Sequence, residues 1–140
     1  EPILFAMRTA ALSGVDVRLM VPMHGDSKIL EWACKSYLGE VVEAGVKVYL
    51  YKPGFNHSKI MVSDAYISTC GSTNIDFRSF ENNFESNIFF YDTEMALRIK
   101  NIYLEDEEHC IDIEEVRDFT HRSFIQRLWE SLVRLLSPLL

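Results

Sequence analysis

Strand-like runs alternate with amphipathic segments of helical length along most of this chain, and that alternation constrains its fold more than any other feature. The β-branched and aromatic runs predict strands at 15–22, 46–51, 58–63, 66–70 and 85–91. Helical spacing of apolar residues predicts a helix at 1–12, one at 28–44 that Gly45 ends, and one at 92–107 that Asp92 or Thr93 caps. The rest of the chain after residue 107 is expected to be mostly helical as well. Alternation of this kind is typical of an α/β fold, with a mixed β-sheet, helices packed on its faces and later strands that are partly antiparallel.

Length and composition favour one globular domain that covers residues 1–140. The sequence lacks both the long apolar run of a membrane-spanning helix and the ordered regions of a signal peptide. Its three cysteines are widely spaced, which predicts neither a disulfide framework nor a metal knuckle and favours a reducing compartment. Because the chain begins at Glu1 inside a helix-like segment, we expect it to be part of a longer protein.

Charge is unevenly distributed along the sequence. The net charge of −7 argues against binding to nucleic acid, because phosphate-backbone binders usually carry a basic surface. Residues 116–140 differ from the rest, since four arginines there outnumber two acidic residues and alternate with Phe, Trp and Leu. This basic, apolar segment fits either a helix that lies among the headgroups of an anionic membrane or one that packs on the domain.

The chemistry is concentrated between Asn56 and Asn74, where six positions follow the template H-x-K-x4-D-x6-G-S-x-N. These positions are His57, Lys59, Asp64, Gly71, Ser72 and Asn74. A chance match in a chain of this size is on the order of one in a million, so the pattern carries a strong hypothesis.

The residue types in this template suit the cleavage of a phosphodiester. His57 and Lys59 are two residues apart at the start of a predicted strand, so their side chains are expected on the same face of the sheet. A neutral imidazole can attack phosphorus, while an ammonium group and nearby hydroxyl or amide donors stabilise the negative oxygens of the transition state. Gly71 would allow the tight turn that presents Ser72 and Asn74 to those oxygens. No metal or other cofactor is expected, because no ligand cluster accompanies the template.

The template resembles the signature of the phospholipase D superfamily. Three flanking stretches, EAGVKVYLYKPGFNHSKIMVSD, NIDFRSFENNFE and the ending LLSPLL, are similar to the C-terminal catalytic domain of bacterial cardiolipin synthases. The resemblance implies transfer of a phosphatidyl group between two phosphatidylglycerol molecules through a phosphohistidine, which yields cardiolipin and glycerol. It also implies that Glu85 orients the catalytic histidine. Asp64 belongs to the candidate catalytic set, although its place at a hairpin turn favours a role in fixing the loop.

Enzymes of this kind use two copies of the template, and this chain contains one. The resemblance therefore implies a partner, which is either the N-terminal half of the same enzyme or a second chain in a homodimer, and an isolated half that is inactive. It also implies that the substrate is an anionic phospholipid. The whole enzyme would then be anchored to the bacterial cytoplasmic membrane by segments upstream of this chain, while the domain itself is soluble. Three alternatives stay open. The chain could be a single-motif homodimeric phosphodiesterase or nuclease, or a non-catalytic dimerisation domain. It could also belong to a phosphatidylserine synthase or a broader transphosphatidylase of the same superfamily. Whether His57 is the nucleophile or the general acid is open as well.

Overall fold

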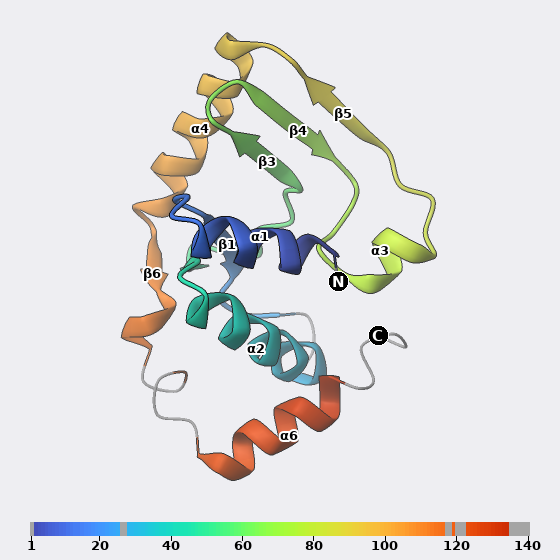
Figure 1. Ribbon diagram of the computed structural model, residues 1–140, viewed down its shortest axis with the longest axis vertical. Helices are drawn as coiled ribbons and strands as arrows, with labels where there is room; N and C mark the ends of the chain where they lie inside the picture. Colours follow the sequence, from blue (N-terminus) through green and yellow to red (C-terminus); the bar gives the residue numbers. More distant parts are fainter. Residues whose placement is uncertain (1, 26–27, 117–118, 120–122, 135–140) are drawn as a thin grey trace. The chain divides into compact units, whose positions relative to one another are not determined.

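The computed structural model describes residues 2–25, 28–116, 119 and 123–134, without the side chains of a few helical residues. The chain divides into two compact units, which are Glu1–Phe55 together with Cys110–Leu140, and Asn56–His109. We call them the first and the second unit and describe each by itself (Figure 1).

The first unit is built on a three-stranded sheet of order β1-β2-β6. Strand β1 (Arg18–Pro22) runs parallel to β2 (Lys47–Tyr51), and β6 (Cys110–Asp112) pairs with β2 in the antiparallel direction. The helical elements are α1 (Pro2–Leu12), α2 (Lys28–Glu43), the 3-10 turn η1 (Ile113–Glu115) and α6 (Phe124–Arg134). Apolar residues of α1, α2, β1 and β2 pack around one buried cluster, formed by Val41, Val46, Val48, Ile113 and Phe119.

Helix α2 ends where the sequence predicts, at a glycine. The amide of Gly45 donates to the carbonyl of Val42, and the amide of Val46 donates to that of Val41. This pair of bonds is a Schellman closure, which requires a left-handed residue, and Gly45 has a φ of 91°. The closure turns the chain directly into β2, whose Val48 enters the core.

The second unit is an antiparallel sheet of order β3-β4-β5 with a helix beside it (Figure 1). Its strands are β3 (Ile60–Ser63), β4 (Ile67–Gly71) and β5 (Asn87–Phe90), and α4 (Thr93–Glu107) contacts β3 and β4. The short helix α3 (Phe77–Glu81) lies between β4 and β5 in the sequence. Asp92 caps α4 by accepting a hydrogen bond from the Met95 amide at 2.7 Å, as the sequence predicts.

The α/β class, the mixed pairing and the helices are confirmed, whereas three details of the prediction are wrong. The strands form two separate three-stranded sheets instead of one. Strand β3 begins at Ile60, so His57 and Lys59 precede it. Residues 110–112 form a strand and not a helix, because they pair with β2 more than 50 residues earlier in the chain, a partner that local propensity does not reveal.

The C-terminal segment contains one helix within the described residues, α6, and the remainder of 116–140 lies largely outside them. Helix α6 packs on α2, where Trp129 meets Trp32 edge to face with ring centroids 6.2 Å apart. Glu130 and Val133 are buried, whereas Ile125, Leu128, Trp129 and Leu132 are each at least half exposed. Among the described helices, none is long and apolar enough to cross a membrane.

Candidate active site

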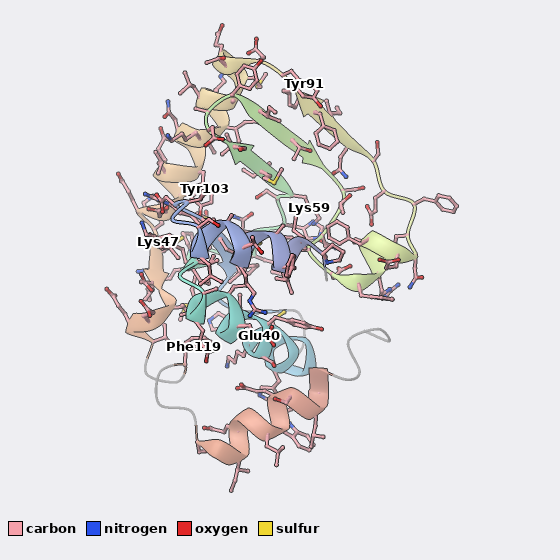
Figure 2. All side chains as sticks on the ribbon, in the orientation of Figure 1. Glu40, Lys47, Lys59, Tyr91, Tyr103 and Phe119 are labelled. Carbon is pink, nitrogen blue, oxygen red and sulfur yellow. The ribbon has the colours of Figure 1, made fainter. Side chains whose placement is uncertain are left out.

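Strand register brings most of the signature to one end of the second unit's sheet. Ile60 pairs with Cys70, and Gly71 pairs with Asn87, so the chain positions around 59, 71 and 87 form a row across the three strands. The next residues beyond this row include His57, Ser72 and Glu85, which therefore gather at the same end of the sheet. Figure 2 marks that end by the label of Lys59.

A side-chain turn holds the backbone around His57. The amide of Ser58 donates to Oδ1 of Asn56 at 3.0 Å, which closes a local loop around the exposed histidine. Lys59 Nζ donates to the carbonyl of His57 at 2.8 Å, and the carbonyl of Lys59 accepts from the Gly71 amide at 3.1 Å. His57 and Lys59 are therefore close to each other, and the Lys59 backbone is tied to the end of β4.

Gly71 is required here by close approach and not by an unusual backbone angle. A Cβ atom at this position would collide with the carbonyl oxygen of Ser86 and with the side chain of Asn87. Without it, β4 and β5 approach closely enough for the Ser72 amide to donate to the Ser86 carbonyl at 3.0 Å. The Ser86 amide in turn donates to Ser72 Oγ, also at 3.0 Å. These two bonds fix the position of the Ser72 hydroxyl at the end of the sheet.

Glu85 accepts hydrogen bonds on both of its carboxylate oxygens. Ser72 Oγ donates to Oε2, and Asn83 Nδ2 donates to Oε1 at 3.3 Å. The Ser72 hydrogen bond lowers the pKa of Glu85 most strongly, with further lowering by Asn83, Ser79 and the positive charge of Lys59, while desolvation acts in the opposite direction. Glu85 is therefore held ionised, and its charge is coupled to that of Lys59.

One signature residue, Asp64, lies apart from this group. Asp64 is at the tip of the β3–β4 hairpin, where it and Ala65 both adopt positive φ values, and Ser63 Oγ donates to its carboxylate at 3.1 Å. Asp64 stands five positions after Lys59, roughly 16 Å along an extended chain, which places it at the opposite end of the sheet. This placement fits the turn-fixing role. Asn74 is exposed in the loop that follows β4.

Three site residues escaped the sequence reasoning: Asn56, Ser79 and Asn83. Asn56 and Asn83 each stand two residues before a residue they bind, a spacing at which Asn commonly makes local hydrogen bonds. That spacing was the available signal. Ser79 is buried on α3 and contributes to the lowered pKa of Glu85 from six residues away, which no local pattern predicts.

Within the residues that the structure describes, no three His, Cys, Asp or Glu side chains are grouped closely enough to hold a metal ion. The end of the sheet provides an imidazole, an ammonium group, a hydroxyl group and an ionised carboxylate. These groups suit histidine-centred phosphoryl chemistry, in which positive charge and hydrogen-bond donors stabilise the phosphorus-bound oxygens.

Known structures share this fold. The chain is similar to the Nuc protein of Salmonella typhimurium, a phospholipase D family member, with a TM-score of 0.66 and 18% identity, and the match covers 79% of this chain and 72% of that one. It is also similar to NucT of Helicobacter pylori, with a TM-score of 0.62 and 25% identity over 79% of this chain and 74% of that one.

Sequence relatives are more similar still. All 140 residues align with cardiolipin synthases of Clostridium perfringens at 45% identity and of Geobacillus thermodenitrificans at 49% identity. The chain spans 29% and 28% of the length of these two relatives. Residues 1–106 match the family model described as the phospholipase-D-like domain of cardiolipin synthase. The chain therefore belongs to the phospholipase-D-like domain family of cardiolipin synthases.

Proposed function

We propose that this chain is one half of a phosphatidyl transferase that joins two phosphatidylglycerol molecules into cardiolipin and releases glycerol. The observation that carries the proposal is the gathering of His57, Lys59, Ser72 and Glu85 at one end of a sheet, in a chain that aligns along its whole length with cardiolipin synthases. The four groups match what cleavage of a phosphodiester requires, and the relatives supply the lipid as substrate class.

The reaction proceeds in two displacements. A ring nitrogen of one histidine bonds to phosphorus, the bond from phosphorus to the terminal glycerol oxygen breaks, and a second histidine gives that oxygen a proton. The hydroxyl group of a second phosphatidylglycerol then attacks the phosphohistidine, loses its proton to the second histidine and displaces the first. His57 takes one of these two roles, and a second copy of the template supplies the other.

The remaining groups act on charge and orientation. The ammonium group of Lys59 stabilises the oxygens on phosphorus, assisted by donors from Ser72 and Asn74. The hydroxyl of Ser72 donates to Glu85 in the free chain, so it changes acceptor when a phosphate enters. Glu85 is ionised, and an ionised carboxylate is a strong hydrogen-bond acceptor. We therefore assign to Glu85 the role of orienting the His57 ring.

The partner of this half is a second template-bearing domain, either the N-terminal half of the same enzyme or another copy of this chain. The lipid substrate places the enzyme at the bacterial cytoplasmic membrane. The exposed stripe of Ile125, Leu128, Trp129 and Leu132 on α6 supports contact with that membrane, because these residues share one side of the helix and belong to the basic part of the sequence.

The test is cardiolipin formation from phosphatidylglycerol in detergent micelles, by the chain alone and by any longer protein that contains it. Replacing His57 with Ala should reduce the rate at least 1,000-fold, on the order expected for loss of a nucleophile or essential acid. His109→Ala is the matched control, because His109 is exposed in the same unit and lies outside the template. Undiminished cardiolipin formation by His57→Ala would refute the proposal, and cleavage of single-stranded DNA that depends on His57 would favour the nuclease alternative.

A further inference from the structure

The segment between Asn74 and Glu85 exposes an unusual number of large apolar side chains. Ile75 is 52% exposed, Phe77 39%, Phe80 49% and Phe84 fully exposed, all within ten residues. Burial of side chains of this size stabilises a folded protein, so a cluster of them left in water is a mark of an interaction surface. We call these four residues the α3 apolar set.

The exposure is a consequence of how α3 is held. Asp76 caps the helix by accepting from the Ser79 amide at 2.6 Å, and the amides of Asn82 and Asn83 both donate to the carbonyl of Arg78. Ser79 is the buried residue of the helix, whereas Phe77 and Phe80 are exposed. These two phenylalanines are three positions apart, so they are neighbours on the helix surface. This arrangement inverts the usual amphipathic pattern, in which apolar residues face the protein.

The location of the set indicates what it binds. Ile75 directly follows Asn74, and Phe84 directly precedes Glu85, so both ends of the segment enter the site. A molecule with its phosphate at that site and apolar chains attached close to the phosphate would reach the set, and a glycerophospholipid has this construction. The segment 75–84 carries two acidic residues and one arginine, which disfavours a nucleic-acid backbone as the occupant.

We propose that Ile75, Phe77, Phe80 and Phe84 form a surface for the acyl chains of a phospholipid at the face of a bilayer. The inference rests on the proposed function for the position of the phosphate. It adds a lipid-contacting segment in the second unit to the stripe already described on α6 of the first.

The first experiment measures binding and does not require catalysis. Co-sedimentation measures how much of the chain binds to vesicles, for the parent and for the double variant Phe80→Gln/Phe84→Gln. One set of vesicles is pure phosphatidylcholine, and the other contains phosphatidylglycerol as well. We expect at least a tenfold loss of partition on both kinds of vesicle. Ile102→Gln is the matched control, because Ile102 is 49% exposed on α4 of the same unit, and it should bind as the parent does.

The second experiment compares substrates in a protein that forms cardiolipin. The double variant should lose at least tenfold in rate on long-chain phosphatidylglycerol vesicles and keep its rate on a dibutyryl analogue dissolved as monomers. Equal partition of the double variant and the parent would overturn the proposal, as would equal losses on both substrates.

If the variant instead abolished self-association in sedimentation velocity while vesicle binding was unchanged, a second copy of the chain would be the occupant and the lipid proposal would be wrong. Failure of the parent to form cardiolipin would count against the proposed function alone, since vesicle binding is measured independently.

Discussion

The two units of this chain divide core and chemistry between them. The first unit holds the buried apolar cluster of Val41, Val46, Val48, Ile113 and Phe119, and contains no residue of the template. The second unit contains the whole template, yet among its described residues Ala96 is the buried apolar side chain, beside the buried hydroxyls of Ser68 and Ser79.

This difference shows how the site is maintained. In the first unit, apolar burial determines the arrangement of the elements. In the second, strand register and side-chain hydrogen bonds determine it, through the Asn56 loop, the Ser72–Ser86 pair and the Glu85 contacts. Hydrogen bonds on the surface contribute modestly to stability, so the second unit combines well-defined site geometry with little apolar stabilisation of its own. Substitutions in the two units should therefore affect different measurements.

After His57→Ala, the largest effect is expected from Lys59→Met in the second unit. Removing the ammonium group should lower the rate of cardiolipin formation by about 100- to 1,000-fold, the range seen when one transition-state donor is lost. The free energy of unfolding should change by less than about 0.5 kcal/mol, because Lys59 contributes no core packing. Rate measurements and urea denaturation check the two halves of this prediction. Lys100→Met, an exposed lysine of α4, should leave the rate unchanged.

Val48→Ala, in the first unit, should lower stability and leave the rate of reaction unchanged. Val48 is 1% exposed in the core, so truncation should destabilise the chain by about 2 kcal/mol, from lost apolar burial and the cavity left behind. Urea denaturation measures the loss, and the rate per folded molecule should stay the same. Val15→Ala, at a valine that is 53% exposed in the same unit, is the control and should be nearly neutral. A core variant that abolished activity while still folded would break the comparison.

A smaller effect is expected at the start of α4. Asp92→Ala removes the cap on the Met95 amide and should destabilise the second unit by about 1 kcal/mol. Asp92→Asn should retain nearly all of the stability, because asparagine caps about as well as aspartate. Amide hydrogen exchange along α4 distinguishes the two variants. Equal protection in both would mean that α4 is held by packing instead of by its cap.

The smallest effect concerns the charge of Glu85. Its pKa is lowered from 4.5 chiefly by the Ser72 hydrogen bond, so Glu85 stabilises the folded state above pH 4.5. That contribution is lost as the pH falls through the lowered pKa of the folded state. Ser72→Ala should raise the pKa of Glu85 toward 4.5 and move this loss to higher pH, as followed by NMR titration of the carboxyl carbon. Ser63→Ala, at the far end of β3, should leave the titration unchanged, and a shift there would contradict the assignment.

Local sequence was sufficient for several elements. Asp92 was predicted as a candidate cap of α4, Gly45 as the end of α2, and the hairpin turn at Asp64 and Ala65, all because capping and turns depend on residues a few positions apart. Strand β6 was missed, because Cys110–Asp112 becomes a strand only by pairing with β2. The orientation of His57 by Glu85 stays a prediction.

What the sequence determined by itself is therefore the family signature and most of the local elements. The spacing of His57, Lys59, Ser72 and Asn74 was sufficient to place the chain among phospholipase-D-like proteins, because a chance match to that pattern is improbable in a chain of this length. Only the tertiary structure decided which of them meet. Antiparallel register brought Ser72 to Glu85 and carried Asp64 to the far end of the sheet, since pairing between strands sets distances that separation along the chain does not.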